Sequence, residues 1–138
     1  MSTEQQQVND RIINEVWNQG NLDLLEELCD PNFVLHDGTT IIHGIEGFKR
    51  YIERDRLAFP DVHFMIEDQV VQDDKVVIRF ICRGTHEGYL LGIAPTGKHM
   101  LVSGMALNRF ANDKLVESWM NFDTFGMMHQ LGVISFTE

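Results

Sequence analysis

One face of the segment 115–123 carries an unusual mixture of side chains. If the segment forms a strand, its side chains alternate between two faces, and Glu117, Trp119, Asn121 and Asp123 share one of them. A face that only packs rarely carries a Glu, an Asn and an Asp, and a solvent-exposed face rarely carries a Trp. This mixture is typical of a pocket wall. A carboxylate in a dry pocket has a raised pKa, so it can take a proton from a substrate and return it.

The segment 75–85 also alternates, and it places Arg79 and Arg83 on one face. The opposite face is wholly apolar and is expected to be core; it consists of Val76, Ile78, Phe80 and Cys82. We interpret Arg83, near the strand end, as solvated. Arg79 lies in mid-strand, where a charge needs a partner, and Glu117 or Asp123 across the sheet could supply one. Arg79 is therefore included among the residues expected to bind a substrate.

Two histidines lie where they could contact a pocket. His36 shares a face with Val34, and His86 lies at a glycine-flanked strand exit, where a loop could close over a pocket mouth. Each also has an ordinary interpretation, as a hydrogen-bonded core histidine and as a loop histidine. The six histidines show no helical spacing typical of zinc sites, and the two cysteines, Cys29 and Cys82, form no CxxC pair. We expect no metal site and two buried, reduced thiols.

The composition limits the classes of partner. The chain has 138 residues and a formal net charge of −10, so its average surface repels phosphate backbones and anionic headgroups, and neither nucleic acid nor a membrane is an expected partner. The first residues lack the basic start and apolar run of a signal peptide, and no apolar stretch approaches the ~20 residues of a membrane span. These features predict a cytoplasmic protein. The length and the even spread of charge predict one domain over residues 1–138.

The elements that must position these residues follow from periodicity and turn signals. Helical spacing predicts helices over 3–18, 21–30 and 45–59, and a last short helix over 125–131. Short strands are predicted from residue 33 and over 40–43, and long alternating runs predict a meander of strands over 62–72, 75–85, 99–110 and 115–122. This order predicts an α+β fold: a cone-shaped, curled antiparallel sheet with three N-terminal helices that enclose a pocket. Apolar groups from the first and third helices should line the pocket; they include Val16, Trp17, Phe48 and Ile52.

An ordered set of short motifs gives the sequence a family likeness. The motifs are Pro60-Asp61-Val62, Gly84-Thr85-His86-Glu87-Gly88, Leu91-Gly92-Ile93-Ala94-Pro95-Thr96-Gly97-Lys98, Glu117-Ser118-Trp119 with Asp123, and Gln130-Leu131-Gly132. Over about the whole chain, the set resembles the SnoaL-like polyketide cyclases, often labelled ester cyclases, of the nuclear-transport-factor-2-like superfamily. His36-Asp37 stands where the family often has an Asp-His or His-Asp element, although Gly38-Thr39 replace the proline that frequently follows.

The resemblance implies a chemistry as well as a fold. It implies a cone around a buried apolar pocket, homo-oligomerisation through the open sheet and, in the characterised members, aldol ring closure of a polyketide ester without a cofactor. By the resemblance, Asp123 is the acid and base, and His36, His86 or Asn121 would hold carbonyl oxygens as they become negative. The substrate would be a small apolar molecule with a carbonyl group. A different role for Asp123 is the N-cap of the helix that follows it.

Two other functions fit the same fold. A non-catalytic module would hold an apolar ligand in the cone without turnover. An isomerase or hydrolase of a steroid-like or terpenoid substrate would need a second carboxylate or a phenol facing Asp123, and Glu117 and Tyr51 are the candidates. We also expect a homodimer formed by the sheets, because the convex face would carry too much apolar surface to leave in water. The residues expected on that face are Ile78, Phe80, Met120 and Phe122.

Overall fold

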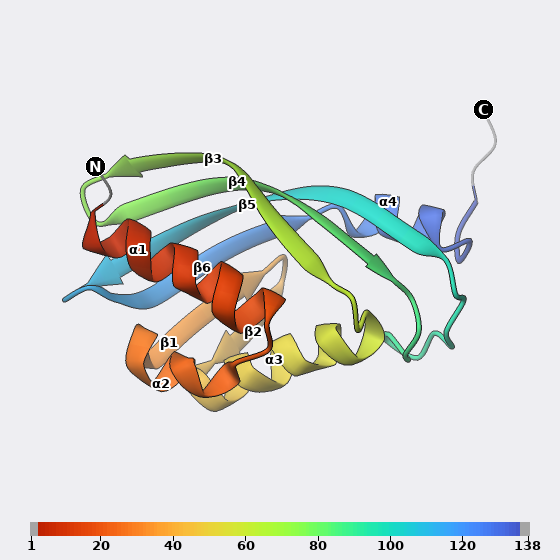
Figure 1. The fold of residues 1–138 in the computed structure, drawn as a ribbon, viewed down its shortest axis with the longest axis horizontal. Helices are drawn as coiled ribbons and strands as arrows, with labels where there is room; N and C mark the ends of the chain where they lie inside the picture. Colours follow the sequence, from red (N-terminus) through yellow and green to blue (C-terminus); the bar gives the residue numbers. More distant parts are fainter. Residues whose placement is uncertain (1–2, 136–138) are drawn as a thin grey trace.

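A computed structural model describes residues 3–135. Its sheet has six strands in the order β2-β1-β6-β5-β4-β3 and arches over the helices without closing (Figure 1). The meander consists of β3 (His63–Gln72), β4 (Lys75–Thr85), β5 (His99–Ala111) and β6 (Lys114–Phe122), in which each strand is antiparallel to the next one in the sequence. At the other edge, β1 (Cys29–Asp37) pairs with β2 (Thr40–His43). The predicted α+β fold with a curled sheet is confirmed, except that β1 runs parallel to β6.

The predicted first helix has two parts. The α-helix α1 (Glu4–Arg11) begins at Thr3, whose side chain accepts the Gln6 N–H, while the Gln6 side chain accepts the Thr3 N–H. It continues as a π-helix, η1 (Ile12–Asn18). π-Helices are rare in proteins, and those that occur are often found at functional sites. Gly20, with a φ of 78°, then turns the chain.

The other helices agree with the predictions to different degrees. The segment predicted as a helix over 21–30 forms only the 3₁₀ turn η2 (Leu22–Leu24) and the single turn α2 (Leu25–Leu28). Cys29 already has extended backbone angles, since β1 begins there. The third helix, α3 (Gly44–Ala58), and the last, α4 (Thr124–Gln130), lie within one residue of their predicted limits.

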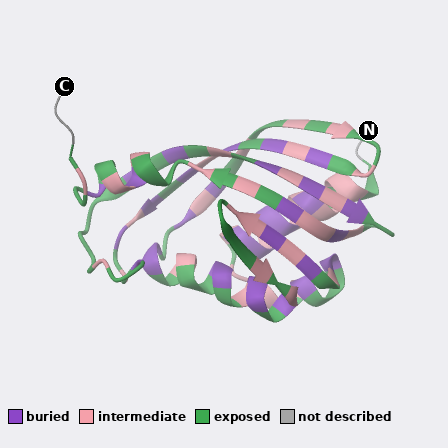
Figure 2. Ribbon diagram, turned by 180° about the vertical axis from the view of Figure 1, so that it is seen from behind, coloured by how far each residue is buried: buried purple, intermediate pink, exposed green. Residues whose placement is uncertain are grey.

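The buried face of the sheet lies against α1, η1 and α3 (Figures 1 and 2). On β4 the apolar set expected in the core is buried, with exposed fractions of 2% or less. Figure 2 shows buried and exposed residues alternating along the long strands. Cys29 and Cys82 are both buried and unpaired, as expected.

A β-bulge interrupts the alternation of β6. Phe110 pairs with Leu115 and Arg109 pairs with Glu117, so Val116 has no partner of its own in β5. Because side chains alternate with a period of two, one extra residue exchanges the two faces for the rest of the strand.

The bulge makes the predicted orientation of β6 wrong. Ser118 is buried, and Met120 and Phe122 line an internal cavity, so these three side chains point inward. Trp119 and Asn121 are exposed and point outward.

The apolar residues that were predicted to form a dimer interface on the convex face lie on the inner face of the sheet instead. Ile78 and Phe80 are 2% and 1% exposed and belong to the core, together with Met120 and Phe122. The outer face carries a different apolar set on β3, β5 and β6: Met65, Leu101, Met105 and Trp119. Within residues 3–135, no helix is long and apolar enough to cross a membrane.

Candidate functional site

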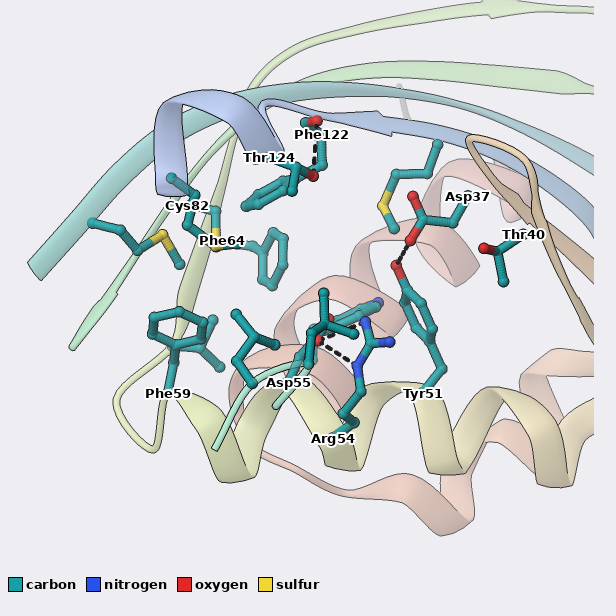
Figure 3. Close-up of a pocket in the computed structure, with 17 residues that line it drawn as sticks. Asp37, Thr40, Tyr51, Arg54, Asp55, Phe59, Phe64, Cys82, Phe122 and Thr124 are labelled. Carbon is teal, nitrogen blue, oxygen red and sulfur yellow. Dashed lines mark hydrogen bonds and ion pairs between the residues drawn. The ribbon is translucent and has the colours of Figure 1, made fainter. Parts of the chain in front are cut away.

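A cavity of about 190 Å³ lies between α3, the inner face of the sheet and the start of α4 (Figure 3). Most of its wall is apolar and includes Trp17, Phe59, Phe64, Leu90, Met100 and Phe122. The polar side chains that reach it are few: Asp37, Thr40, Tyr51, Arg54, Asp55 and Thr124. A mainly apolar pocket with a few convergent polar groups is the usual form of a small-molecule site.

Asp55 is the acidic group best suited to proton transfer. Burial raises the pKa of its carboxyl from 3.8 to about 6, and the neighbouring Arg54 opposes that effect. The Arg54 Nε and Nη2 atoms donate to Asp55 Oδ1 over 3.2 and 3.0 Å. The side chains of Asp55 and Arg54 are 24% and 43% exposed, so the pair lies where the cavity opens. A carboxyl with this pKa is a base above pH 6 that can return its proton to a product.

Tyr51 and Asp37 form a second polar pair in the wall. The Tyr51 hydroxyl donates to Asp37 Oδ2 over 2.6 Å. Burial, followed by the charge of Asp55, raises the pKa of Tyr51, so its phenol stays protonated. The guanidinium of Arg54 lies over the Tyr51 ring, 4.8 Å from its centre. Figure 3 shows both pairs pointing into the same cavity from α3 and from the end of β1.

The local sequence explains how α3 delivers these groups. Phe48, Tyr51 and Ile52 are buried, and Asp55 follows them at i+7, i+4 and i+3, so it lies on the buried stripe. Helix α3 ends at Ala58, because Pro60 cannot continue it.

A loop after β4 covers one end of the cavity. The N–H groups of Glu87 and Gly88 both donate to Ala58 O, over 3.0 and 3.1 Å, at the end of α3. This attachment places Leu90 and Leu91 in the cavity wall. A side chain at Gly88 would collide with the carbonyl oxygen of Leu57, so the close approach requires glycine.

Trp17 and Tyr51, two of the residues expected to contact a substrate, do line the cavity. Trp17 comes from η1, and Tyr51 comes from α3.

Three residues expected in the pocket lie on the outer face of the sheet instead. His36 Nε2 lies 2.7 Å from Glu117 Oε2, and the His36 ring stacks on Trp119 with a centroid separation of 5.1 Å. Arg109 also contacts Glu117, over 3.0 Å, and these bonds to His36 and Arg109 lower the pKa of Glu117. The bulge in β6 explains the outward position of Glu117 and Trp119, and the pairing of His36 with Trp119 in register carries the histidine to the same face.

Arg79 and Asn121 also lie outside the cavity. Arg79 is exposed and pairs with Asp68 on β3, with Nη2 to Oδ2 at 2.6 Å, so the expected partners Glu117 and Asp123 are wrong. Asn121 is exposed on the outer face of β6.

His86 has a position of its own. It is fully buried, but it does not line the cavity; its Nδ1 accepts the Thr96 N–H over 3.2 Å, and its ring lies against Phe59. The backbone of His86 also bonds to Lys98 and Gly97. These contacts hold together the loop that covers the cavity. His86 therefore supports the cavity wall without reaching the cavity itself.

Asp123 is the N-cap of α4. Its Oδ1 accepts the Gly126 N–H over 2.9 Å, which is the alternative that the sequence left open. The residue is exposed, whereas its neighbours Phe122 and Thr124 line the cavity. Asp123 therefore helps to shape the site, and its carboxylate is engaged outside the cavity.

Among residues 3–135, no three His, Cys, Asp or Glu side chains are grouped so that they could hold a metal ion.

Comparison with known proteins agrees with this geometry. A sequence profile of the SnoaL-like polyketide cyclases matches residues 7–131. The chain belongs to the SnoaL-like polyketide cyclase family. A comparison with curated proteins finds no match.

Solved structures of the SnoaL-like type share the fold over nearly the whole chain. A SnoaL-like candidate cyclase from Jannaschia sp. CCS1 has a TM-score of 0.89 and 22% identity, covering 96% of this chain and 94% of its own. IdmH, a candidate polyketide cyclase from Streptomyces antibioticus, has a TM-score of 0.82 and 28% identity over 94% and 99%. A candidate cyclase from Acidithiobacillus ferrooxidans has a TM-score of 0.85 and 27% identity over 98% and 99%. The nuclear-transport-factor-2-like fold is thus confirmed.

Within this SnoaL-like chain, sequence reasoning missed the polar groups that do reach the cavity. Asp55 had a detectable signal, because it interrupts an apolar helical stripe at i+4 from Tyr51. Asp37 and Thr40 are cross-strand neighbours in the β1–β2 hairpin. Because successive side chains of a strand alternate between faces, a prediction that placed His36 on the outer face would have placed Asp37 on the inner face. Arg54 had no signal of its own.

Proposed function

We propose that this chain catalyses cofactor-free acid–base chemistry of the aldol type on a small, mainly apolar carbonyl or ester compound, with Asp55 as the acid and base. The observation that carries the proposal is a carboxyl with a pKa of about 6 in the wall of a mainly apolar cavity. Membership of the SnoaL-like polyketide cyclase family supports the reaction class. The cavity of about 190 Å³ is below the roughly 300–1,000 Å³ of drug-sized ligand sites, which favours a small substrate.

The reaction would begin with Asp55 ionised. A carboxylate oxygen takes a proton from the carbon next to a substrate carbonyl, and the C–H electron pair moves to form an enolate. The enolate carbon then attacks a second carbonyl carbon of the same molecule, so that a C–C bond forms and the second carbonyl oxygen becomes an alkoxide. Asp55 returns its proton to that alkoxide. Substrate and product are isomers, and the carboxylate is regenerated.

Arg54 and Tyr51 have supporting roles in this proposal. Two of the five guanidinium N–H groups of Arg54 are directed at Asp55, which leaves others for an enolate oxygen at the cavity mouth. Arg54 also limits the rise in the pKa of Asp55, so the carboxylate is mainly ionised at pH 7. The Tyr51 hydroxyl, already oriented by Asp37, provides a neutral polar contact on the same wall.

An isomerase is the second candidate, because Tyr51 supplies the phenol that such a reaction needs. In that case Asp55 would move a proton between two carbons of one substrate, and the Tyr51 hydroxyl would turn its single proton from Asp37 to the carbonyl oxygen. Both reactions share the first step, the removal of a proton next to a carbonyl. A module that only binds its ligand would lack that step.

The shared step can be measured without the natural substrate. The protein is mixed with 2-tetralone, an aromatic ketone with acidic α-hydrogens, in D₂O, and the loss of the α-proton signals is followed by NMR. We expect exchange well above the protein-free rate for the unmodified protein and for Asp123→Asn, which keeps the cap, and a loss of this acceleration for Asp55→Asn. Equal rates for the unmodified protein and Asp55→Asn would contradict the proposed function, and a lack of acceleration with retained 2-tetralone binding would favour the binding module.

We also propose that the protein is a homodimer formed through the outer face of the sheet. The support is the apolar set on that face, in which Leu101 and Met105 are 59% and 52% exposed and Trp119 is 38% exposed. The proposed interface is thus the convex face expected from the sequence, but the apolar residues that this face carries differ from the predicted ones.

A further inference from the structure

A second, smaller cavity of about 40 Å³ lies deeper in the core, next to the main one. Trp17, Phe64 and Met120 line both cavities, so these side chains form the partition between them. The rest of the deep cavity is bounded by α1, η1 and the inner faces of the sheet and α3. Its wall is apolar except at one end, where Asn9, Asn108 and Ser118 meet.

Two members of the partition are fixed by backbone contacts. The Asn18 side chain donates to Phe64 O over 3.0 Å and accepts the Phe64 N–H over 2.8 Å, which attaches the end of η1 to β3. Arg56 donates to Trp17 O over 2.6 Å. Met120 is the adaptable member, because an unbranched thioether changes rotamer at low cost. Met120 is therefore the member at which we expect a ligand to pass from one cavity into the other.

The polar end of the deep cavity has one unused donor. Ser118 Oγ donates to Asn108 Oδ1 over 2.6 Å, and Asn108 Nδ2 donates to Asn9 Oδ1 over 2.7 Å. This chain fixes the orientation of the Asn9 amide. Asn9 Nδ2 has no hydrogen-bond partner within residues 3–135, although Asn9 is only 2% exposed. Buried donors are nearly always hydrogen-bonded, because an unpaired one retains the cost of its desolvation, so the free Nδ2 at the end of this chain of three buried polar residues indicates a site for an acceptor.

The geometry points to the deep cavity as a second compartment of the ligand pocket, in which Asn9 Nδ2 binds an acceptor oxygen at the far end of the ligand. At about 40 Å³, the compartment has room for one small group, such as a carbonyl, of a ligand whose ring system would occupy the main cavity. The ligand class is therefore an aromatic or alicyclic carbon skeleton with a carbonyl or ether oxygen at the end remote from Asp55. The inference deepens the proposed function, since it describes the substrate of the same pocket, but its test measures binding alone.

Two probes of nearly equal shape test the acceptor. 2-Acetylnaphthalene carries a carbonyl where 2-isopropenylnaphthalene carries a C=CH₂ group, and their dissociation constants are measured by calorimetry. We expect the unmodified protein to bind the ketone about 5- to 10-fold more tightly than the alkene, the effect of one good hydrogen bond. Asn9→Leu should abolish this preference while the affinity for the alkene changes little. Ser118→Ala is the matched control, because it also breaks one bond of the polar chain but retains Asn9 Nδ2, and it should keep the preference.

A second measurement does not depend on the variants. In the unmodified, ¹⁵N-labelled protein, the side-chain amide signal of Asn9 should shift with the ketone and stay in place with the alkene. Any of three results would overturn the inference: equal affinities for the two probes, a preference for the ketone that persists in Asn9→Leu, or an Asn9 signal that does not shift when the ketone is added. The probes should bind Asp55→Asn with the same preference, so a preference for the ketone without α-proton exchange would keep the deep compartment and reject the proposed reaction.

Discussion

The substitution Asp55→Asn should remove the proposed base and make the protein more stable at neutral pH. Burial raises the pKa of Asp55 from 3.8 to about 6, so the folded state disfavours the charged form. At pH 7 the carboxyl is mainly ionised in both the folded and the unfolded states. At about 1.4 kcal/mol per pH unit, the difference in pKa lowers the free energy of unfolding by about 3 kcal/mol. Asparagine avoids this cost in a side chain of the same shape.

The pH dependence gives the prediction its sign. The folded state binds more protons than the unfolded state between about pH 4 and pH 6, so the unmodified protein loses stability as the pH rises through that window. The advantage of Asp55→Asn should thus be complete above pH 6 and shrink toward zero near pH 4. At pH 7 it should raise Tm by on the order of 10 °C. Urea unfolding at pH 4.5, 5.5 and 7 measures the difference directly.

Asp61→Asn provides a control of opposite sign. Asp61 accepts bonds from the Thr85 N–H and hydroxyl, both over 2.7 Å, and these bonds lower the pKa of Asp61. Its carboxylate therefore stabilises the fold at neutral pH, and that contribution is lost as the pH falls through the lowered pKa. Asp61→Asn should be less stable than the unmodified protein at pH 7. If Asp55→Asn is no more stable than the unmodified protein at pH 7, or if its advantage does not vary with pH, the burial argument is refuted.

Three further outcomes test other parts of the structure. Gly88→Ala should displace the loop that carries Leu90, because the new Cβ would collide with the backbone at the end of α3. The variant should bind 2-acetylnaphthalene several-fold more weakly, and its loop should be cleaved faster by a protease; unchanged binding and proteolysis would show that the loop is not fixed there. Trp119→Glu should convert the proposed dimer to a monomer in light scattering at micromolar concentration, because it places a charge on the apolar outer face, opposite Leu107 of β5 and two residues from Glu117. A dimer in the variant, or a monomeric unmodified protein, would refute the interface. Asp123→Ala should lower the free energy of unfolding by about 1 kcal/mol and Asp123→Asn by much less, since only the first removes the cap; equal losses in urea unfolding would argue against a capping role.

The architecture could be predicted because its signals are local. Alternation and two-residue polar turns predict the four long strands, and Asp73, Asn112 and Asp113 adopt the left-handed backbone that such turns require. The parallel pairing of β1 with β6 could not be read from the sequence, because it joins segments about 80 residues apart. The π-helical half of the first helix also leaves no mark on the hydrophobic period.

The site was harder to predict because one residue decides the orientation of a strand. The bulge at Val116 turns Glu117, Trp119 and Asn121 outward, and nothing in the spacing of the side chains reveals it. Asp55, by contrast, could have been found from its place on the apolar stripe of α3. The sequence alone cannot show which carboxylate faces a cavity and which, like Asp123, is bound to a backbone amide.

The pH profile of α-proton exchange is the most direct test of Asp55 as the base, because it links the proton transfer to the titration of one carboxyl group. The rate of deuterium incorporation into 2-tetralone, corrected for the protein-free rate, is measured from pH 4.5 to 8. If Asp55 is the base, the rate rises with pH around a midpoint near 6, the pKa of the Asp55 carboxyl, and Asp55→Asn shows no such rise. A midpoint near 4, or a profile that Asp55→Asn leaves unchanged, would contradict it.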